Sequence, residues 1–125
     1  MKTTESAEQQ ALFEWAEIVS KKTPELRLLF AIPNGGKRPI TTAMRMKAEG
    51  QKSGVLDICL PVPCSGYHGL YIEMKVGKNK PSENQVWWIN QLREQGYRVE
   101  VCYGWEVVVK VIVGYLTGKE SEGLK

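Results

Sequence analysis

Histidine and cysteine are scarce in this sequence, which has one histidine and three cysteines among 125 residues. The cysteines, Cys59, Cys64 and Cys102, form no CxxC pair. Their spacing does not match a structural zinc site, and their odd number does not match a disulfide framework. We therefore expect reduced thiols, as in a cytoplasmic protein.

Long hydrophobic runs and a strong charge imbalance are also absent. The most apolar window, 107–116, is interrupted by Lys110 and is far too short to span a bilayer. The first residues lack the apolar segment of a secretory signal, so we expect a cytoplasmic protein with no membrane association. The 17 Lys and Arg against 14 Asp and Glu leave a net charge of +3. This charge permits a polyanionic partner but does not require one.

The composition is that of an ordinary globular domain, with 42% hydrophobic and 25% charged residues. The length suits a single hydrophobic core. We find no internal repeat, low-complexity tract or linker. We therefore expect one domain over residues 1–118, and a disordered tail over residues 119–125.

Hydrophobic spacing and turn residues predict alternating helices and strands. We expect helices over 5–22, 39–50, 82–96 and 107–115, and strands over 26–32, 55–60, 70–76 and 97–103. The strands 55–60 and 70–76 are expected to pair as a hairpin. This order predicts an α/β or α+β fold in which helices flank a central mixed sheet.

Two acidic residues stand inside apolar strands, Asp57 between Leu56 and Ile58, and Glu73 between Ile72 and Met74. Charged groups are seldom buried without a partner or a metal. Glu73 and Lys75 share one strand face because side chains alternate, and Asp57 joins them if the two strands pair. Such a group suits a Mg²⁺ ion that orients water against a phosphodiester. The alternative is a simple cross-strand ion pair.

Two further polar residues have both a functional and a structural interpretation. Glu8 lies on the same helical stripe as Leu12 and Trp15, so its carboxylate needs a partner, such as a metal or its waters. It can equally complement the helix N-terminus. Gln85 follows Ser82 by three residues, the spacing of a capping box, and this is a sufficient structural role.

Basic residues and glycines supply candidates for phosphate contacts. The loop 34–38 lacks the spacing of a phosphate-binding Walker loop, so we expect no nucleotide cofactor. Its glycines permit close approach of a DNA backbone, and nearby lysines extend the basic surface. The alternative is plain solvated loop charge. The DNA-binding candidates are Asn34, Gly35, Gly36, Lys37, Arg38, Lys52, Lys78 and Lys80.

Gly54-x-x-Asp57 followed by Glu73-Met74-Lys75 resembles the signature of the restriction-endonuclease-like nuclease superfamily. The wider set of segments is similar to the stand-alone, phage-type VRR-NUC domain, over about residues 5–116. These segments are 8–9, 30–36, 54–57, 67–75, Ser82-x-x-Gln85 and 101–105. One departure is Leu56, where the family commonly has proline before the motif aspartate.

This resemblance implies a restriction-endonuclease-like core and a Mg²⁺- or Mn²⁺-dependent, structure-selective DNA endonuclease. It implies that Asp57, Glu73 and the backbone carbonyl of Met74 bind the metal, with Glu8 as a further acid, directly or through water. Lys75 becomes the catalytic lysine and Gln85 an additional catalytic residue. A phage or prophage protein acting in the cytoplasm of a bacterial host is also implied.

Stand-alone members are similar to dimeric Holliday-junction resolvases, so we expect a homodimer that cuts four-way junctions. Trp87 lies off the buried stripe of its helix and is available for a dimer contact. A symmetric dimer places two sites on one junction. The alternatives are a DNA-structure binding module that does not cut, and a nuclease for flaps, single strands or RNA.

Overall fold

The structure, a computed structural model, describes residues 3–33 and 39–119. The order of helices and strands expected from the sequence is confirmed within these residues, with one added 3-10 helix, η1. The elements are α1 Glu5–Val19, η1 Pro24–Leu28, β1 Phe30–Ala31, α2 Ile40–Ala48, β2 Ile58–Leu60, β3 Leu70–Lys75, α3 Glu83–Glu94, β4 Arg98–Tyr103 and α4 Trp105–Thr117. The predicted tail, apart from Lys119, lies outside the described residues.

The strands form one mixed sheet in the order β1-β2-β3-β4. β2 and β3 pair antiparallel, with Ile58 opposite Ile72, so the predicted hairpin is confirmed. β4 runs parallel to β3, with Tyr103 opposite Lys75. The chain makes this parallel connection through α3, as parallel strands require a crossover.

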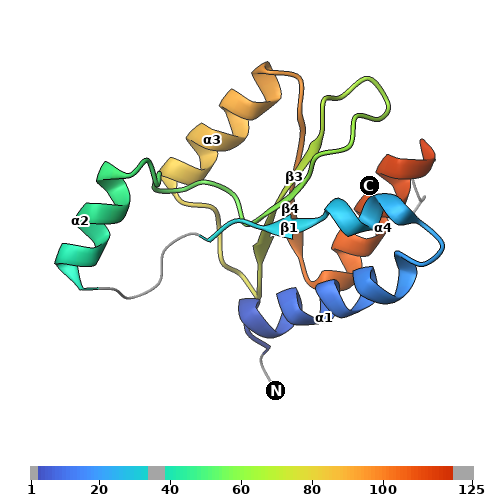
Figure 1. Ribbon diagram of the computed structural model, residues 1–125, viewed down its shortest axis with the longest axis horizontal. Coiled ribbons are helices and arrows are strands. Elements are labelled where there is room, and N and C mark those ends of the chain that lie inside the picture. Colours follow the sequence, from blue (N-terminus) through green and yellow to red (C-terminus); the bar gives the residue numbers. More distant parts are fainter. Residues whose placement is uncertain (1–2, 34–38, 120–125) are drawn as a thin grey trace.

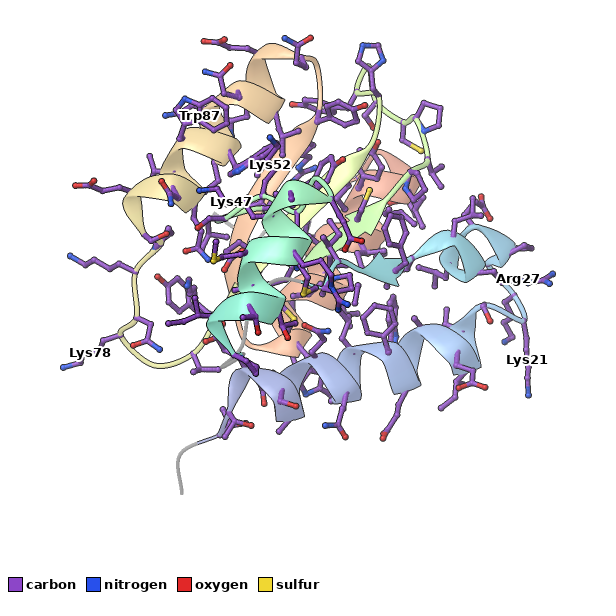
Figure 2. The ribbon with its side chains drawn as sticks, turned by 60° about the vertical axis from the view of Figure 1, so that its left-hand side comes forward. Lys21, Arg27, Lys47, Lys52, Lys78 and Trp87 are labelled. Carbon is purple, nitrogen blue, oxygen red and sulfur yellow. The ribbon has the colours of Figure 1, made fainter. Side chains whose placement is uncertain are left out.

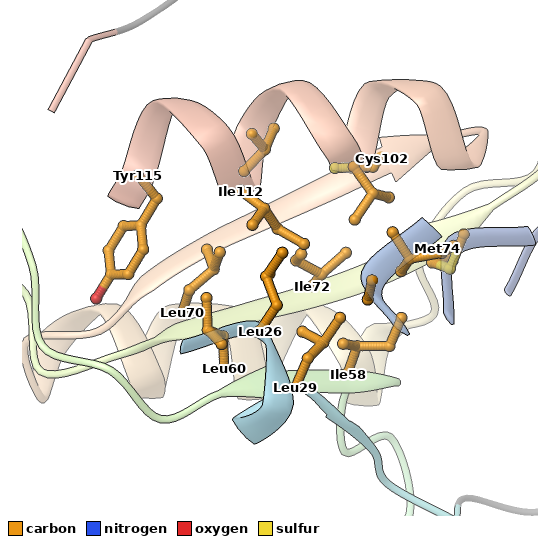
Figure 3. Close-up of a cluster of buried hydrophobic side chains, with 14 residues drawn as sticks. Leu26, Leu29, Ile58, Leu60, Leu70, Ile72, Met74, Cys102, Ile112 and Tyr115 are labelled. Carbon is orange, nitrogen blue, oxygen red and sulfur yellow. The ribbon is translucent and has the colours of Figure 1, made fainter. Parts of the chain in front are cut away.

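The two faces of the sheet are covered by different helices, with α1 and α4 on one side and α3 on the other (Figure 1). Leu70, Ile72 and Met74 alternate along β3 and face α1 and α4 in the larger core, shown in Figure 3. A smaller cluster of Leu56, Ile89 and Val99 packs between the sheet and α3. The residues of β3 between those of the larger core therefore face α3.

The prediction of a strand over residues 26–32 is wrong for most of this segment. Pro24 opens the 3-10 helix η1, and the strand is limited to Phe30–Ala31. Proline suits the first position of a helix because its φ is fixed and its missing N–H is not needed there. Leu26 and Leu29 are both buried in the core. Their spacing of three fits a helical turn, whereas a strand would turn them to opposite faces.

The closing helix α4 is longer than expected, because it begins at Trp105 rather than near Val107. Its β-branched residues still form a helix, since Val108, Val111, Ile112 and Tyr115 are buried together in the core. None of the helices that the structure describes is long and apolar enough to cross a membrane. α2 differs from the other helices, since it buries none of its residues.

Candidate active site

Within the part of the chain that the structure describes, one charged residue is buried. This residue is Glu73, with only 1% of its surface exposed. It lies on the face of β3 that is turned toward α3. Its Oε2 atom accepts a hydrogen bond from Gln85 Nε2 at 2.8 Å and lies 3.4 Å from Lys75 Nζ. Its Oε1 atom is buried and has no hydrogen-bond partner among the described residues. A buried oxygen without a hydrogen-bond partner lowers the stability of the fold unless a ligand contacts it.

Asp57 comes directly before β2 and is brought to Glu73 by the antiparallel register of β2 and β3. Its Oδ2 atom accepts a hydrogen bond from the backbone N–H of Met74 at 2.9 Å. This bond fixes the Asp57 carboxylate beside the strand residue that separates Glu73 from Lys75. The strand pairing on which the predicted convergence of these residues depended is therefore present.

Glu5, the first residue of α1, is the third acid at this site. One carboxylate oxygen from each of Glu5, Asp57 and Glu73 lies within 4.8 Å of the other two. Glu5 is exposed, Asp57 is half-buried and Glu73 is buried. Three oxygens at this separation form an arrangement that suits a hard divalent cation.

The electrostatics of the site disfavour three separate negative charges. Burial and the neighbouring Asp57 carboxylate raise the pKa of Glu73 to about 8, against the lowering effect of Lys75. A carboxyl group in an apolar site beside another carboxylate holds its proton more tightly. A divalent cation would replace that proton, because its charge compensates both carboxylates.

Gln85 lies on the first turn of α3. It makes the contact expected of a helix cap and also a contact with the candidate site. Its Oε1 atom accepts from the backbone N–H of Ser82 at 2.9 Å, which completes the predicted capping box. Its Nε2 atom donates to Glu73. The cap therefore orients the Gln85 amide, and the nitrogen of that amide holds the buried carboxyl group of Glu73.

The turn that leads to Asp57 is also attached to α3. Asn84 Nδ2 donates to Ser53 Oγ at 3.1 Å, and Trp88 Nε1 donates to the Ser53 carbonyl at 3.0 Å. Gly54 has a φ of +83°, and a Cβ atom built on it would lie 2.6 Å from Asn84 Cβ. Only glycine accommodates both this backbone conformation and this approach.

Glu8, the acid that the resemblance assigned to the first helix, is placed differently from Glu5. Its Oε1 atom accepts from the backbone N–H of Trp105 at 3.0 Å, and its Oε2 atom accepts from Thr3 Oγ1 at 2.8 Å. Trp105 is the first residue of α4. The N-cap residue of this helix is Gly104, which has no side chain that could cap the helix. Glu8 thus contacts the N-terminus of the neighbouring helix α4, whereas the structural alternative considered from the sequence was the N-terminus of its own helix.

Sequence reasoning missed Glu5. It precedes Glu8 by three residues and so lies on the same side of α1, where residues three apart are neighbours. The argument that Glu8 faces the sheet therefore applied to Glu5 as well. Predicting which of the two reaches the strands required the position of α1 along the sheet.

The predicted DNA-binding residues fall into two groups. Residues 34–38 lie outside the described residues. Lys52, Lys78 and Lys80 are exposed. In Figure 2, Lys47, Lys52 and Lys78 lie in the half of the molecule that carries α2 and α3, whereas Lys21 and Arg27 project from the far end. Trp87 is also in that half, and 56% of its surface is exposed.

Comparison with known proteins gives two findings. The family described as the VRR-NUC domain matches residues 2–106. A solved structure described as "VRR_NUC domain protein" superimposes with a TM-score of 0.78 and 26% sequence identity, covering 99% of this chain and 97% of the other. No curated protein matches the chain.

Proposed function

Because the chain belongs to the VRR-NUC family of nucleases, we propose that it is a Mg²⁺- or Mn²⁺-dependent, structure-selective DNA endonuclease that hydrolyses phosphodiester bonds. The observation that carries this proposal is the unpartnered, buried Oε1 atom of Glu73 beside two further carboxylates. We also propose residues 1–118 as the nuclease domain.

The donor set fits a divalent cation with a preference for oxygen. Asp57 and Glu73 would hold it, together with the backbone carbonyl of Met74. The cluster supports Glu5 as the acid from α1, a position that the resemblance gave to Glu8. The set contains no thiol or imidazole, which suits Mg²⁺ or Mn²⁺ better than zinc or copper.

The bound cation would supply charge neutralisation at the phosphate and a lowered pKa for the attacking water. Lys75 has its ammonium group at the edge of the carboxylate cluster, 3.4 Å from Glu73. There the ammonium would orient the water, whereas accepting the water's proton would require the neutral amine form of Lys75. Gln85 acts through Glu73, because its amide fixes the rotamer that leaves Oε1 free. Exposed lysines would contact the DNA backbone without reading its sequence.

For the substrate we propose branched DNA, with a four-way junction cut by a homodimer. Trp87 supports a protein contact, because a large aromatic side chain more than half exposed is typical of interface surfaces. Two sites related by a two-fold axis suit the symmetric incision of a junction. Flaps, single strands and RNA present the same phosphates, and only cleavage experiments separate them.

The test is incision of end-labelled four-way junction, flap, duplex and single-stranded DNA and RNA in Mg²⁺, Mn²⁺ or EDTA. We expect metal-dependent paired cuts in the junction that disappear in Asp57→Ala and Glu73→Gln. Glu14→Ala is the matched control, because Glu14 is an exposed acid on the same helix as Glu5. Cutting confined to flaps or single strands would support the nuclease activity and contradict the four-way junction as the substrate. Tight binding to the junction without cutting of any substrate would contradict the nuclease activity.

The dimer is tested separately by sedimentation of the wild-type chain and Trp87→Ala. Mixed dimers of wild-type and Asp57→Ala chains should nick only one strand of a junction per binding event. A monomer that makes paired cuts would contradict the two-site arrangement.

A further inference from the structure

The loop 76–82, between β3 and α3, is attached to β4 by a tyrosine hydroxyl. Tyr103 is the last residue of β4 and lies opposite Lys75 in the parallel register. Its Oη atom donates to the backbone carbonyl of Asn79 at 2.6 Å. Lys78 and Lys80 stand on either side of Asn79, and both are exposed. The hydrogen bond therefore fixes the backbone between two exposed lysines.

The loop is also tied at both of its ends. The Asn79 N–H donates to the Val76 carbonyl at 3.2 Å, closing a turn in which Gly77 has a φ of +60°. At the other end, the capping box of Ser82 begins α3. The contact of Tyr103 with Asn79 lies between these two attachments, and it is long-range in sequence. It holds the tip of the loop in a fixed relation to the sheet and to Lys75.

We propose that Tyr103 is a positioning residue for DNA binding, holding Lys78 and Lys80 where they meet the phosphates beside the cleavage site. This inference rests on the proposed function. Ordering two lysine side chains and their loop on binding carries an entropic cost, which a preorganised backbone reduces. Each correctly placed ammonium then neutralises a phosphate and releases counterions.

The expected effect is moderate, because 44% of the Tyr103 surface is exposed and water competes for the same carbonyl. A single neutral hydrogen bond at such a position corresponds to about a two- to tenfold change in an equilibrium constant. Because Tyr103 does not touch the carboxylates, its loss should change DNA affinity and KM while leaving kcat and metal affinity unchanged.

The experiment compares Tyr103→Phe with Tyr67→Phe. Tyr67 is exposed to a similar extent, 40%, lies in the distant loop between β2 and β3, and its hydroxyl makes no hydrogen bond within the described residues. We expect Tyr103→Phe to weaken binding to a DNA junction about three- to fivefold. KM should rise to match, with Mg²⁺ affinity and kcat retained and the melting temperature lowered by at most a few degrees. Tyr67→Phe should behave like the wild type throughout.

A double-mutant cycle separates positioning from general stabilisation. In a Lys78→Ala, Lys80→Ala background, Tyr103→Phe should have no further effect, because there are no ammonium groups left to position. An equal loss in both backgrounds overturns the inference, as does wild-type binding by Tyr103→Phe in a chain that cuts DNA. A wild-type chain that neither binds nor cuts DNA rejects the proposed function and this inference together.

Discussion

Glu8→Ala should destabilise the fold rather than remove a metal ligand. The substitution deletes the carboxylate that accepts from Trp105 N–H at 3.0 Å. The preceding Gly104 has no side chain to replace it. The first turn of α4 would then lose the acceptor that α1 supplies to its N-terminus.

The magnitude follows from two contributions. Loss of a side-chain cap costs about 1 kcal/mol, and loss of a carboxylate at a helix N-terminus costs about 0.3–1 kcal/mol. The same α4 buries Val108, Val111, Ile112 and Tyr115 in the larger core, so fraying of its first turn is felt by the whole domain. The contact of Glu8 with Thr3 is exposed and adds little. We expect a loss of about 1–2 kcal/mol, or about 4–8 °C in melting temperature.

The assay is urea denaturation of the metal-free protein, followed by Mg²⁺ titration of the same variants. Glu8→Gln keeps a neutral acceptor and should lose about half as much stability, since the dipole contribution alone disappears. Glu5→Ala should show the reverse pattern, with near wild-type stability and weakened Mg²⁺ binding. The reasoning is refuted if Glu8→Ala retains full stability and fails to bind metal.

Two further predictions concern the residues around the carboxylates. Gly54→Ala should cost about 2–4 kcal/mol in urea denaturation, because a Cβ atom 2.6 Å from Asn84 Cβ adds crowding to a φ of +83°; a cost below about 0.5 kcal/mol would contradict the close approach. Burial and then Asp57 raise the pKa of Glu73 from 4.5 to about 8, so the folded protein holds a proton that the unfolded chain releases near pH 4.5. This contribution to stability is complete below about pH 4.5 and is lost as the pH rises to about 8. In EDTA, the melting temperature of the wild type should therefore fall across this window relative to Glu73→Gln; a constant difference between the two would show that the carboxyl is already ionised in the folded protein.

The sequence was sufficient for the parts of the site that depend on local spacing. Asp57 and Glu73 were singled out because a charge within an apolar run is an anomaly that a partner or a metal explains. Lys75 followed from the alternation of side chains, and the Ser82–Gln85 cap from a spacing of three. Each of these arguments needs only neighbours in the chain.

The features that the sequence did not predict depend on where whole elements lie. The apolar run 26–32 is too short for its periodicity to distinguish a strand from a helical turn. Pro24, at the first position of η1, favours the helical turn. The choice between Glu5 and Glu8 depends on how far α1 extends past the sheet. Glu8 contacts Trp105 at the start of α4, and no pattern in either segment predicts this contact.

The two interpretations of Gln85 were alternatives at the level of sequence and are one interaction in the structure. A carboxamide has an acceptor and a donor at the same end, so its Oε1 completes the cap at Ser82 while its Nε2 holds Glu73. A glutamate at this position would satisfy the cap equally well, but it would place another carboxylate against Glu73. The cap alone therefore does not account for a glutamine here, whereas a buried carboxylate that needs a neutral donor does. The same turn of α3 holds the turn at Ser53 through Asn84, so a single helix start contacts both Glu73 and the segment that leads to Asp57.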